Sequence, residues 1–167
     1  MKVTLIAAVD DRIGIGKDNQ IAWQNDEDMK HFSSYTEGKV VVMGRKTWDS
    51  LPVKLLPRRG NWVLTESGGT KELIAMANSN DNFMCSDLDY LLEMIRYRGI
   101  NVDEICIIGG QSIYEQFMPH ATDLVITRIK GDYQCDRFFP EIDLKVWHRY
   151  DIDVKDTCRI EYYKRNG

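Results

Sequence analysis

The sequence predicts an α/β fold: a single domain with a mostly parallel central sheet, helices on both faces and an antiparallel C-terminal hairpin at one edge. Two segments carry most of this prediction, VVVMGRKTWDSLP at Val40–Pro52 and ICIIGGQSIYEQFMP at Ile105–Pro119. Each begins as a β-branched apolar run, reaches glycine and continues as a helix-forming stretch. A third observation is the alternation of residue types in Val146–Val154 and Arg159–Lys164, which is typical of an antiparallel hairpin.

The elements in the first part of the chain follow from hydrophobic periodicity and from the residues at their ends. Val3–Val9 is an apolar run that fits a central strand, and Asp26–Tyr35 has Met29 and Phe32 on one side of a short amphipathic helix. The next predicted elements are a strand at Val40–Met43, a helix at Lys46–Leu51 closed by Pro52, strands at Asn61–Thr65 and Phe83–Cys85, and an ambiguous segment at Lys71–Ala77.

The second part repeats the alternation of strand and helix. Ser86 is a suitable cap for a helix over Asp87–Tyr97, and Gly99 ends it. Further on we expect a strand at Glu104–Ile108, a helix at Ser112–Met118 ended by Pro119, and a strand at Leu124–Ile129 before the hairpin. Internal repeats, low-complexity segments and linkers are not visible, so residues 1–167 are expected to form one domain.

Composition narrows the class of protein. The 167 residues are 43% hydrophobic and 29% charged, which is ordinary for a globular chain with a real core. The net charge is -4 and basic residues do not gather in a block, so nucleic acid is not an expected partner. Apolar runs are too short to span a bilayer, and we read MKVTLIAAVDD as a strand because Asp10 and Asp11 interrupt it.

The cysteines and histidines point to neither disulfides nor a metal. Cys85, Cys106, Cys135 and Cys158 lack C-x-x-C spacing, and histidine does not accompany them in a zinc pattern. Scattered thiols in a chain of this size fit a reducing cytoplasm.

Both strand-to-helix segments suit phosphate binding. The backbone N–H groups at the start of a helix are unpaired and carry partial positive charge. Two such starts in a small domain favour a ligand with two phosphates. Together with an acidic residue after Trp23, these segments resemble dihydrofolate reductase, and the resemblance extends from about Lys2 to Lys164.

The resemblance implies a dihydrofolate-reductase-like fold and NADPH-dependent reduction of 7,8-dihydrofolate to 5,6,7,8-tetrahydrofolate, in support of one-carbon and thymidylate metabolism. Hydride would pass from nicotinamide C4 to pterin C6, with protonation at N5. It also implies a cytoplasmic monomer that binds dihydrofolate and antifolate inhibitors. Two alternatives remain: a related pterin or pyrimidine reductase on the same fold, and a non-catalytic nucleotide-binding protein.

Asp28 is the expected acid–base group. A carboxylate in the first turn of a helix often only complements the helix dipole, and Asp26 and Glu27 fit that role. Asp28 differs because it lies on the same face as Phe32, four residues on. The resemblance makes Asp28 the ionisable group of the pterin pocket, where an apolar environment raises its pKa. It also implies that Trp23 orders a water near the substrate and that Thr127 hydrogen-bonds the acid.

The loop Ile13–Trp23 corresponds to the family's mobile loop over the nicotinamide. Gly14 and Gly16 do not form a G-x-G-x-x-G fingerprint, because Asn19 takes the place of the third glycine. Ala22 stands where the family usually has proline, which bears on loop rigidity.

The cofactor positions implied by the resemblance centre on the two glycine segments. Arg45 would approach the adenosine 2′-phosphate, Thr47 the diphosphate, and Gly109-Gly110 would be joined by a cis peptide. Glu66 stands where the family often has serine or arginine, which would weaken the preference for NADPH. The full set is Ala8, Ile15, Gly16, Gly44, Arg45, Lys46, Thr47, Leu64, Thr65, Glu66, Ile108, Gly109, Gly110, Gln111, Ser112, Ile113 and Tyr114.

Arg59 in LLPRRGN is expected to bind the α-carboxylate of the folate glutamate, since a guanidinium group grips a carboxylate with two hydrogen bonds. Arg58 is the alternative, because it occupies the place of the family's glycine. The expected substrate-binding residues are Ile6, Ala7, Asp28, Met29, Phe32, Leu51, Leu56, Arg59, Ile108, Tyr114 and Thr127.

Overall fold

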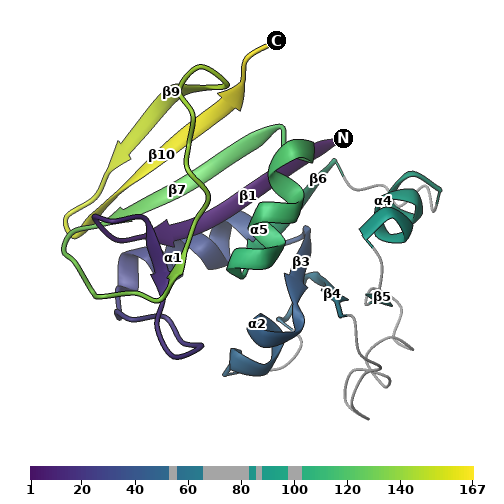
Figure 1. The fold of residues 1–167 in the computed structure, drawn as a ribbon, viewed down its shortest axis with the longest axis horizontal. Coiled ribbons are helices and arrows are strands. Elements are labelled where there is room, and N and C mark those ends of the chain that lie inside the picture. The colour runs from purple at the N-terminus through teal and green to yellow at the C-terminus, as the bar shows by residue number, and fades with distance from the viewer. Residues whose placement is uncertain (53–55, 66–82, 86–87, 98–102) are drawn as a thin grey trace.

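The computed structural model describes residues 1–52, 56–65, 83–85, 88–97 and 103–167. Figure 1 shows a twisted sheet with helices packed on it. The elements are β1 (Lys2–Val9), β2 (Gly14–Gly16), α1 (Asp26–Thr36), β3 (Val40–Gly44), α2 (Arg45–Ser50), β4 (Gly60–Leu64), β5 (Phe83–Cys85), α4 (Leu88–Tyr97), β6 (Glu104–Gly109), α5 (Gln111–Phe117), a 3-10 turn (Met118–His120), β7 (Asp123–Ile129), β8 (Arg137–Phe138), β9 (Trp147–Val154) and β10 (Cys158–Arg165).

The central sheet has the order β5-β4-β3-β6-β1-β7-β10-β9. The strands from β5 to β7 pair in parallel, whereas β10 pairs antiparallel with both β7 and β9. This confirms the predicted parallel sheet with an antiparallel C-terminal edge. Parallel pairing requires a crossover between neighbouring strands, and α1, α2, α4 and α5 lie in such connections.

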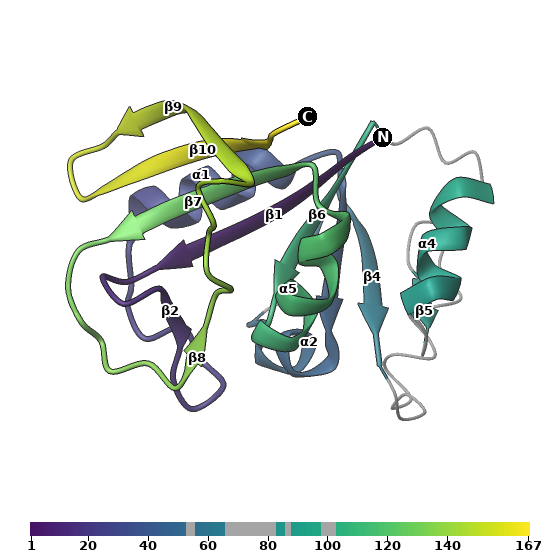
Figure 2. The same ribbon diagram turned by 45° about the horizontal axis from the view of Figure 1, so that its top comes forward.

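Two apolar cores lie on opposite faces of the sheet. Leu5 of β1 and Phe117 of α5 belong to one core, while Ile6 of β1 and Trp48 of α2 belong to the other, against which Phe32 of α1 packs. Adjacent residues of a strand point to opposite faces, so Leu5 and Ile6 separate into different cores. Helices therefore cover both faces as predicted, and Figure 2 shows α1 and α5 on either side of β1 and β7.

Glu104, at the start of β6, fastens α1 to the sheet. Its buried carboxylate accepts hydrogen bonds from the hydroxyl groups of Thr4 (2.5 Å) and Tyr35 (2.5 Å), and the Lys39 ammonium group lies 3.1 Å away. Burial alone would raise the pKa of Glu104, but these three partners outweigh it and lower the pKa. A carboxylate that is both buried and fully partnered holds the helix in one position.

A second sheet, formed by β2 and β8, was not predicted. It joins a part of the chain that the sequence indicated only as a loop, Ile13–Trp23, to the segment after β7. Both strands are too short to show periodicity, and each exists only because the other is present. The observed helix α5 covers Gln111–Phe117, one residue earlier than the predicted helix Ser112–Met118, and a 3-10 turn follows it. Lys71–Ala77, Ser86 and Gly99 lie outside the described residues.

Asp10 anchors the beginning of the loop that contains β2. Its buried carboxylate accepts hydrogen bonds from the backbone N–H groups of Arg12 (2.9 Å), Gly14 (2.8 Å) and Tyr133 (3.0 Å). The Cys135 thiol lies 3.6 Å from the same group. Space at Gly14 is limited, because a Cβ there would lie 2.4 Å from the Cβ of Cys135 and 2.9 Å from Oδ1 of Asp10.

The remaining general expectations concern thiols and membranes. Cys106, Cys135 and Cys158 are free thiols, and the Cys85 side chain lies outside the described part of the structure. The described helices include none that is long and apolar enough to cross a membrane.

Replacing Glu104 tests the attachment of α1. We expect Glu104→Gln to lower the free energy of unfolding at neutral pH by about 1–3 kcal/mol, because hydrogen bonds to a charged acceptor are lost. Since the folded-state pKa of Glu104 is lowered, its contribution is present above the unfolded pKa and disappears as pH falls through the folded pKa. The difference between variant and wild type should therefore shrink in acid.

Denaturant unfolding at neutral pH and below pH 4 measures both effects, with the exposed Glu141→Gln as the matched control. Equal stability of Glu104→Gln and Glu141→Gln at neutral pH would contradict the assigned role of Glu104.

Candidate active site

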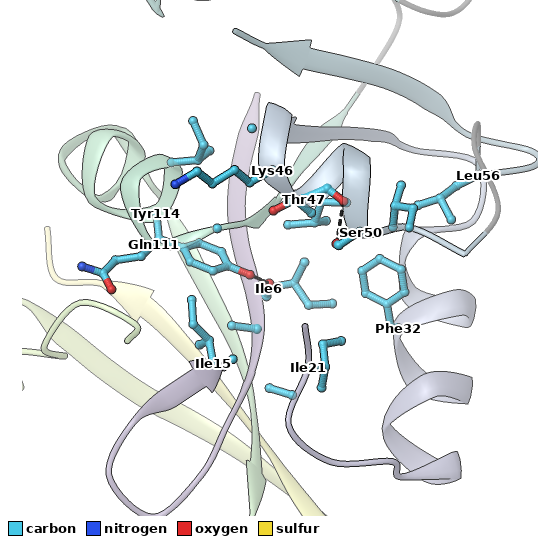
Figure 3. A pocket seen from close by; sticks show the side chains of 18 of the residues that line it. Ile6, Ile15, Ile21, Phe32, Lys46, Thr47, Ser50, Leu56, Gln111 and Tyr114 are labelled. Carbon is cyan, nitrogen blue, oxygen red and sulfur yellow. Dashed lines mark hydrogen bonds between the residues drawn. The ribbon is translucent and has the colours of Figure 1, made fainter. Parts of the chain in front are cut away.

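A cleft of about 1280 Å³ runs across the ends of the central strands, between α1 on one side and the starts of α2 and α5 on the other. Figure 3 shows Phe32 and Leu56 facing Tyr114, Gln111 and Lys46 across it. Predicted site residues that line the cleft are Ile6, Ala7, Ala8, Ile15, Gly16, Trp23, Asp28, Met29, Phe32, Gly44, Arg45, Lys46, Thr47, Leu51, Leu56, Arg59, Leu64, Thr65, Ile108, Gly110, Gln111, Ser112, Ile113 and Tyr114.

Three predicted residues are not among the lining residues. Thr127 is buried in β7 and acts on the cleft through Asp28, and Gly109 is the buried last residue of β6. Glu66 lies outside the described residues, so its direction relative to Arg45 stays a prediction.

Asp28 projects into the cleft from the first turn of α1. Asn25 caps this helix, and its side-chain oxygen accepts the backbone N–H of Asp28 at 2.9 Å. Burial raises the pKa of the Asp28 carboxyl to about 6, although Thr127 and Trp23, which face it, offset part of the increase. Asp28 therefore exchanges protons close to neutral pH. Sequence reasoning missed Asn25, although an asparagine directly before an acidic first turn is an N-cap signal.

Trp23 lies beside Asp28 on the loop that closes this side of the cleft. Its ring packs against Tyr133 with a centroid separation of 5.4 Å. The indole Nε1 is buried and makes no hydrogen bond to any residue that the structure describes. It nevertheless faces the Asp28 carboxyl as a donor and lowers the pKa of that group.

Glu27 does more than complement the helix dipole, which corrects the expectation from the sequence. Its carboxylate accepts the backbone N–H groups of Thr157 (2.6 Å) and Asp156 (3.3 Å), and also the Thr157 hydroxyl. Asn25 reaches the Thr157 hydroxyl at 3.2 Å. The turn between β9 and β10 is thereby fastened to the helical turn that carries Asp28. This contact joins residues far apart in the chain, so local sequence signals do not reveal it.

Tyr114 forms the back of the cleft. Its hydroxyl donates a 2.7 Å hydrogen bond to the carbonyl of Ile6, which Figure 3 marks. Burial, and secondarily the charge of Asp28, raise the pKa of Tyr114, so it stays a neutral donor. Phe139 packs on its ring at 4.9 Å. Tyr114 thus fixes the relative position of α5 and β1 at the back of the cleft.

The two glycine segments form a cradle at the other end of the cleft. Gly44 precedes α2 and Gly110 precedes α5, and neither helix start has a side-chain cap. The Gly109–Gly110 peptide is cis, as expected. A Cβ on Gly44 would lie 2.9 Å from Ile113, and one on Gly110 would lie 3.5 Å from the Thr47 hydroxyl. Uncapped N–H groups and missing side chains fit the close approach of a phosphate-bearing ligand.

The charges in the cleft contrast with those of the chain. The described lining carries the cations Arg45, Lys46, Arg58, Arg59 and Arg137 and one carboxylate, Asp28, whereas the chain has a net charge of -4. The cleft therefore suits an anionic ligand.

Two of the five cations are paired with carboxylates. Arg45 pairs with Asp49 on the same helix at 3.3 Å, and Arg58 pairs with Glu37 at 2.5 Å. Lys46, Arg59 and Arg137 form no ion pair with any residue that the structure describes.

Arg59 is held in place by uncharged partners. Its guanidinium donates to the Thr36 hydroxyl (2.7 Å), the Pro57 carbonyl (2.5 Å) and the Ser33 carbonyl (2.7 Å). Burial, and then the charge of Arg58, lower the pKa of Arg59, yet it remains a cation. Arg59 is therefore a fixed guanidinium that forms no ion pair with a carboxylate of the described residues.

Metal chemistry has no visible support in the described ranges, where no group of three His, Cys, Asp or Glu residues could hold an ion. The arrangement instead offers one proton-exchanging carboxyl group in an apolar cleft, with cations at both ends.

Comparisons with known proteins agree with this geometry. The family model for dihydrofolate reductase matches residues 2–164. A dihydrofolate reductase of Neisseria gonorrhoeae is 40% identical over 147 residues, which cover 88% of this chain and 84% of that protein. One from Staphylococcus haemolyticus is 30% identical over 166 residues, 98% of this chain and 93% of that protein.

The same conclusion follows from a solved structure. Dihydrofolate reductase from Enterococcus faecalis, complexed with NADP(H) and RAB-propyl, superimposes with a TM-score of 0.84 at 25% identity, over 99% of this chain and 97% of that chain. With its fold, its cleft and these matches, the chain belongs to the dihydrofolate reductase family.

Proposed function

We propose that the protein reduces 7,8-dihydrofolate to 5,6,7,8-tetrahydrofolate with NADPH. The observation that carries this proposal is the single acid of the described cleft lining, Asp28, with a pKa of about 6 in apolar surroundings. Phe32 and Tyr114 lie on opposite sides of the cleft, where a flat heteroaromatic ring would be received, and an acid of this pKa suits a ring nitrogen that must gain a proton. An Enterococcus faecalis relative binds NADP(H), which supports the same cofactor here.

The substrate would lie along α1. We infer that the pterin ring meets Asp28 and that the glutamate carboxylate meets Arg59, which has no other ionic partner among the described residues. Arg58 is the weaker candidate because Glu37 already compensates its charge. The distance between the two ends of the ligand is then fixed by one helix, which carries Asp28 and contacts Arg59 through Ser33 and Thr36.

The cofactor would lie across the two glycine segments. Gly44, Thr47 and Gly110 offer room and uncapped N–H groups for its diphosphate. When bound, NADPH supplies the hydride that passes from nicotinamide C4 to pterin C6. The protein contributes orientation and the exclusion of water.

Protonation at pterin N5 would depend on Asp28. The buried Trp23 Nε1 is a donor that faces this carboxyl group, and it would hold a water between Asp28 and the substrate. Thr127 orients the carboxyl from behind. We infer that Asp28 raises the proton affinity of the bound pterin and that the proton arrives from solvent through this water.

Several wider properties belong to the same proposal. We infer a cytoplasmic monomer without a nucleic-acid partner, with antifolates competing for the substrate end of the cleft. A pterin reductase without a glutamate requirement is disfavoured by Arg59, and a non-catalytic nucleotide-binding protein is disfavoured by the tuned acid. One assay distinguishes dihydrofolate reduction from these two alternatives. Dihydrofolate is added to the protein and NADPH, and the consumption of NADPH is monitored as a loss of reduced-nicotinamide absorbance. No consumption at micromolar protein would reject the proposal.

Replacing Asp28 tests the acid. We expect Asp28→Asn to lower kcat near neutral pH by about a hundredfold or more, the usual contribution of a positioned acid–base group. The proton that Asp28 and the bound pterin hold between them is lost as pH rises through about 6, so the wild-type rate should fall there, and this step should be absent in the variant. Activity of the variant should partly recover in acid, where the substrate is already protonated. A wild-type pH profile in Asp28→Asn would remove Asp28 from the chemistry.

The same variant, Asp28→Asn, should gain stability although it loses activity. Because the folded-state pKa of Asp28 is raised, its ionised form costs stability above the unfolded pKa, by an amount that grows up to about pH 6. Asp28→Asn should therefore unfold at a higher temperature than wild type near neutral pH. A less stable variant would mean that its lost activity reflects folding.

Replacing Arg59 tests the position of the glutamate. We expect Arg59→Leu to weaken folate binding by roughly 1.5–3 kcal/mol, because a charge-assisted contact is lost. A pterin without glutamate should bind both proteins equally. Arg58→Leu is the matched control, and the same pattern in that variant alone would shift the assignment by one residue.

Arg45 and Asp49 test the choice of cofactor. Discrimination of NADPH from NADH needs a cation at the 2′-phosphate. We expect Arg45→Leu to remove most of the preference and Asp49→Asn to increase it, because Asp49 competes for Arg45 at 3.3 Å. Glu66→Ser should increase it as well. The measurement is the ratio of kcat/KM for NADPH over NADH at one ionic strength. A ratio that none of these changes affects would place the 2′-phosphate elsewhere.

A further inference from the structure

Arg137 lines the cleft but matches none of the residues assigned above. It belongs to β8 and pairs across the small sheet with Gly16, which also lines the cleft. We propose that Arg137 is a cofactor-binding residue that holds the diphosphate, which rests on the proposed use of NADPH.

The backbone around Arg137 is fixed on both sides. The N–H of Phe138 donates to the side-chain oxygen of Gln111 at 2.9 Å, and the N–H of Asp136 donates to the carbonyl of Gly16 at 3.0 Å. Phe139, next along the chain, is buried in the core. The arginine therefore stands on a rigid base next to the first residue of α5, although β8 has only two residues.

The guanidinium itself has little to hold it. It donates a hydrogen bond to the carbonyl of the preceding residue, Asp136, at 3.1 Å. The Asp136 carboxylate is engaged elsewhere, since it accepts the backbone N–H of Asp18 at 3.2 Å. An exposed arginine on a fixed backbone, facing a cleft and lacking an acidic partner in the described structure, keeps most of its donors for an anion from a ligand.

The order of the strands indicates which anion this is. Thr65 follows β4 and Arg45 follows β3, so the 2′-phosphate belongs to that side of the sheet. Arg137 contacts the opposite side, where Gln111 follows β6 and Gly16 lies beyond β1. The cradle formed by Gly44 and Gly110, at the ends of β3 and β6, lies between Thr65 after β4 and Gly16 beyond β1. The diphosphate, which would cross this cradle, is the anion nearest to Arg137.

The assignment makes the small sheet part of the cofactor site. Asp136 ties β8 to the loop that carries Trp23, and Gln111 ties it to α5. A diphosphate held by Arg137 would add a third attachment. Cofactor binding would therefore order this loop through charge, before any substrate arrives.

Equilibrium binding of NADPH and NADH, measured by quenching of tryptophan fluorescence at low and high salt, tests the proposal. We expect Arg137→Met to weaken both cofactors by the same factor, roughly fivefold to twentyfold at low salt and less at high salt. Arg137→Lys should recover part of the loss. The fragment 2′-AMP, which lacks the diphosphate, should bind wild type and Arg137→Met equally.

Lys130→Met is the matched control, because it removes one positive charge from the same connection between β7 and β8 at an exposed position outside the cleft. Equal affinity of Arg137→Met and Lys130→Met for NADPH at low salt would overturn the proposal. A loss for NADPH and 2′-AMP without a loss for NADH would place Arg137 at the 2′-phosphate and also overturn it. Failure of the wild type to bind either cofactor would instead reject the proposed function.

Discussion

The parallel pairing of β3, β6 and β1 determines where the functional groups of this protein lie. Backbone hydrogen bonds hold these strands in a register that sets Met43 beside Gly109 and Leu5 beside Ile107. Their carboxyl ends therefore meet at one edge, where the glycine segments and the floor of the cleft are formed together. Since α1 is fastened to the same sheet through Glu104, the acid on its first turn faces that edge at a set distance.

The charged groups of the cleft differ in how they are compensated. Arg45 and Arg58 pair with carboxylates, whereas Arg59 is held by uncharged partners. Asp28 gains its raised pKa from burial, which Thr127 and Trp23 offset only in part, so its ionised form lowers the stability of the fold.

The sequence contained enough local information for most of the fold and for the residue types of the site. Strands such as β3 and β6 are continuous apolar runs, and glycine marks their ends, so each could be predicted alone. The pairing of Arg45 with Asp49 could also have been predicted, since the two are four residues apart on a helix. In contrast, the β2–β8 sheet and the Glu27–Thr157 contact join distant segments. The pKa of Asp28 depends on burial and could be predicted in direction only.

The close contact between Gly14 and Cys135 has a consequence for how this chain can change over generations. A methyl group at position 14 would collide with the Cβ of Cys135, which alanine would retain, and with Oδ1 of the buried Asp10. Truncating position 135 alone therefore does not admit a larger residue at position 14. A larger residue at position 14 is therefore unfavourable both in the wild type and after Cys135→Ala, unless the loop backbone itself shifts.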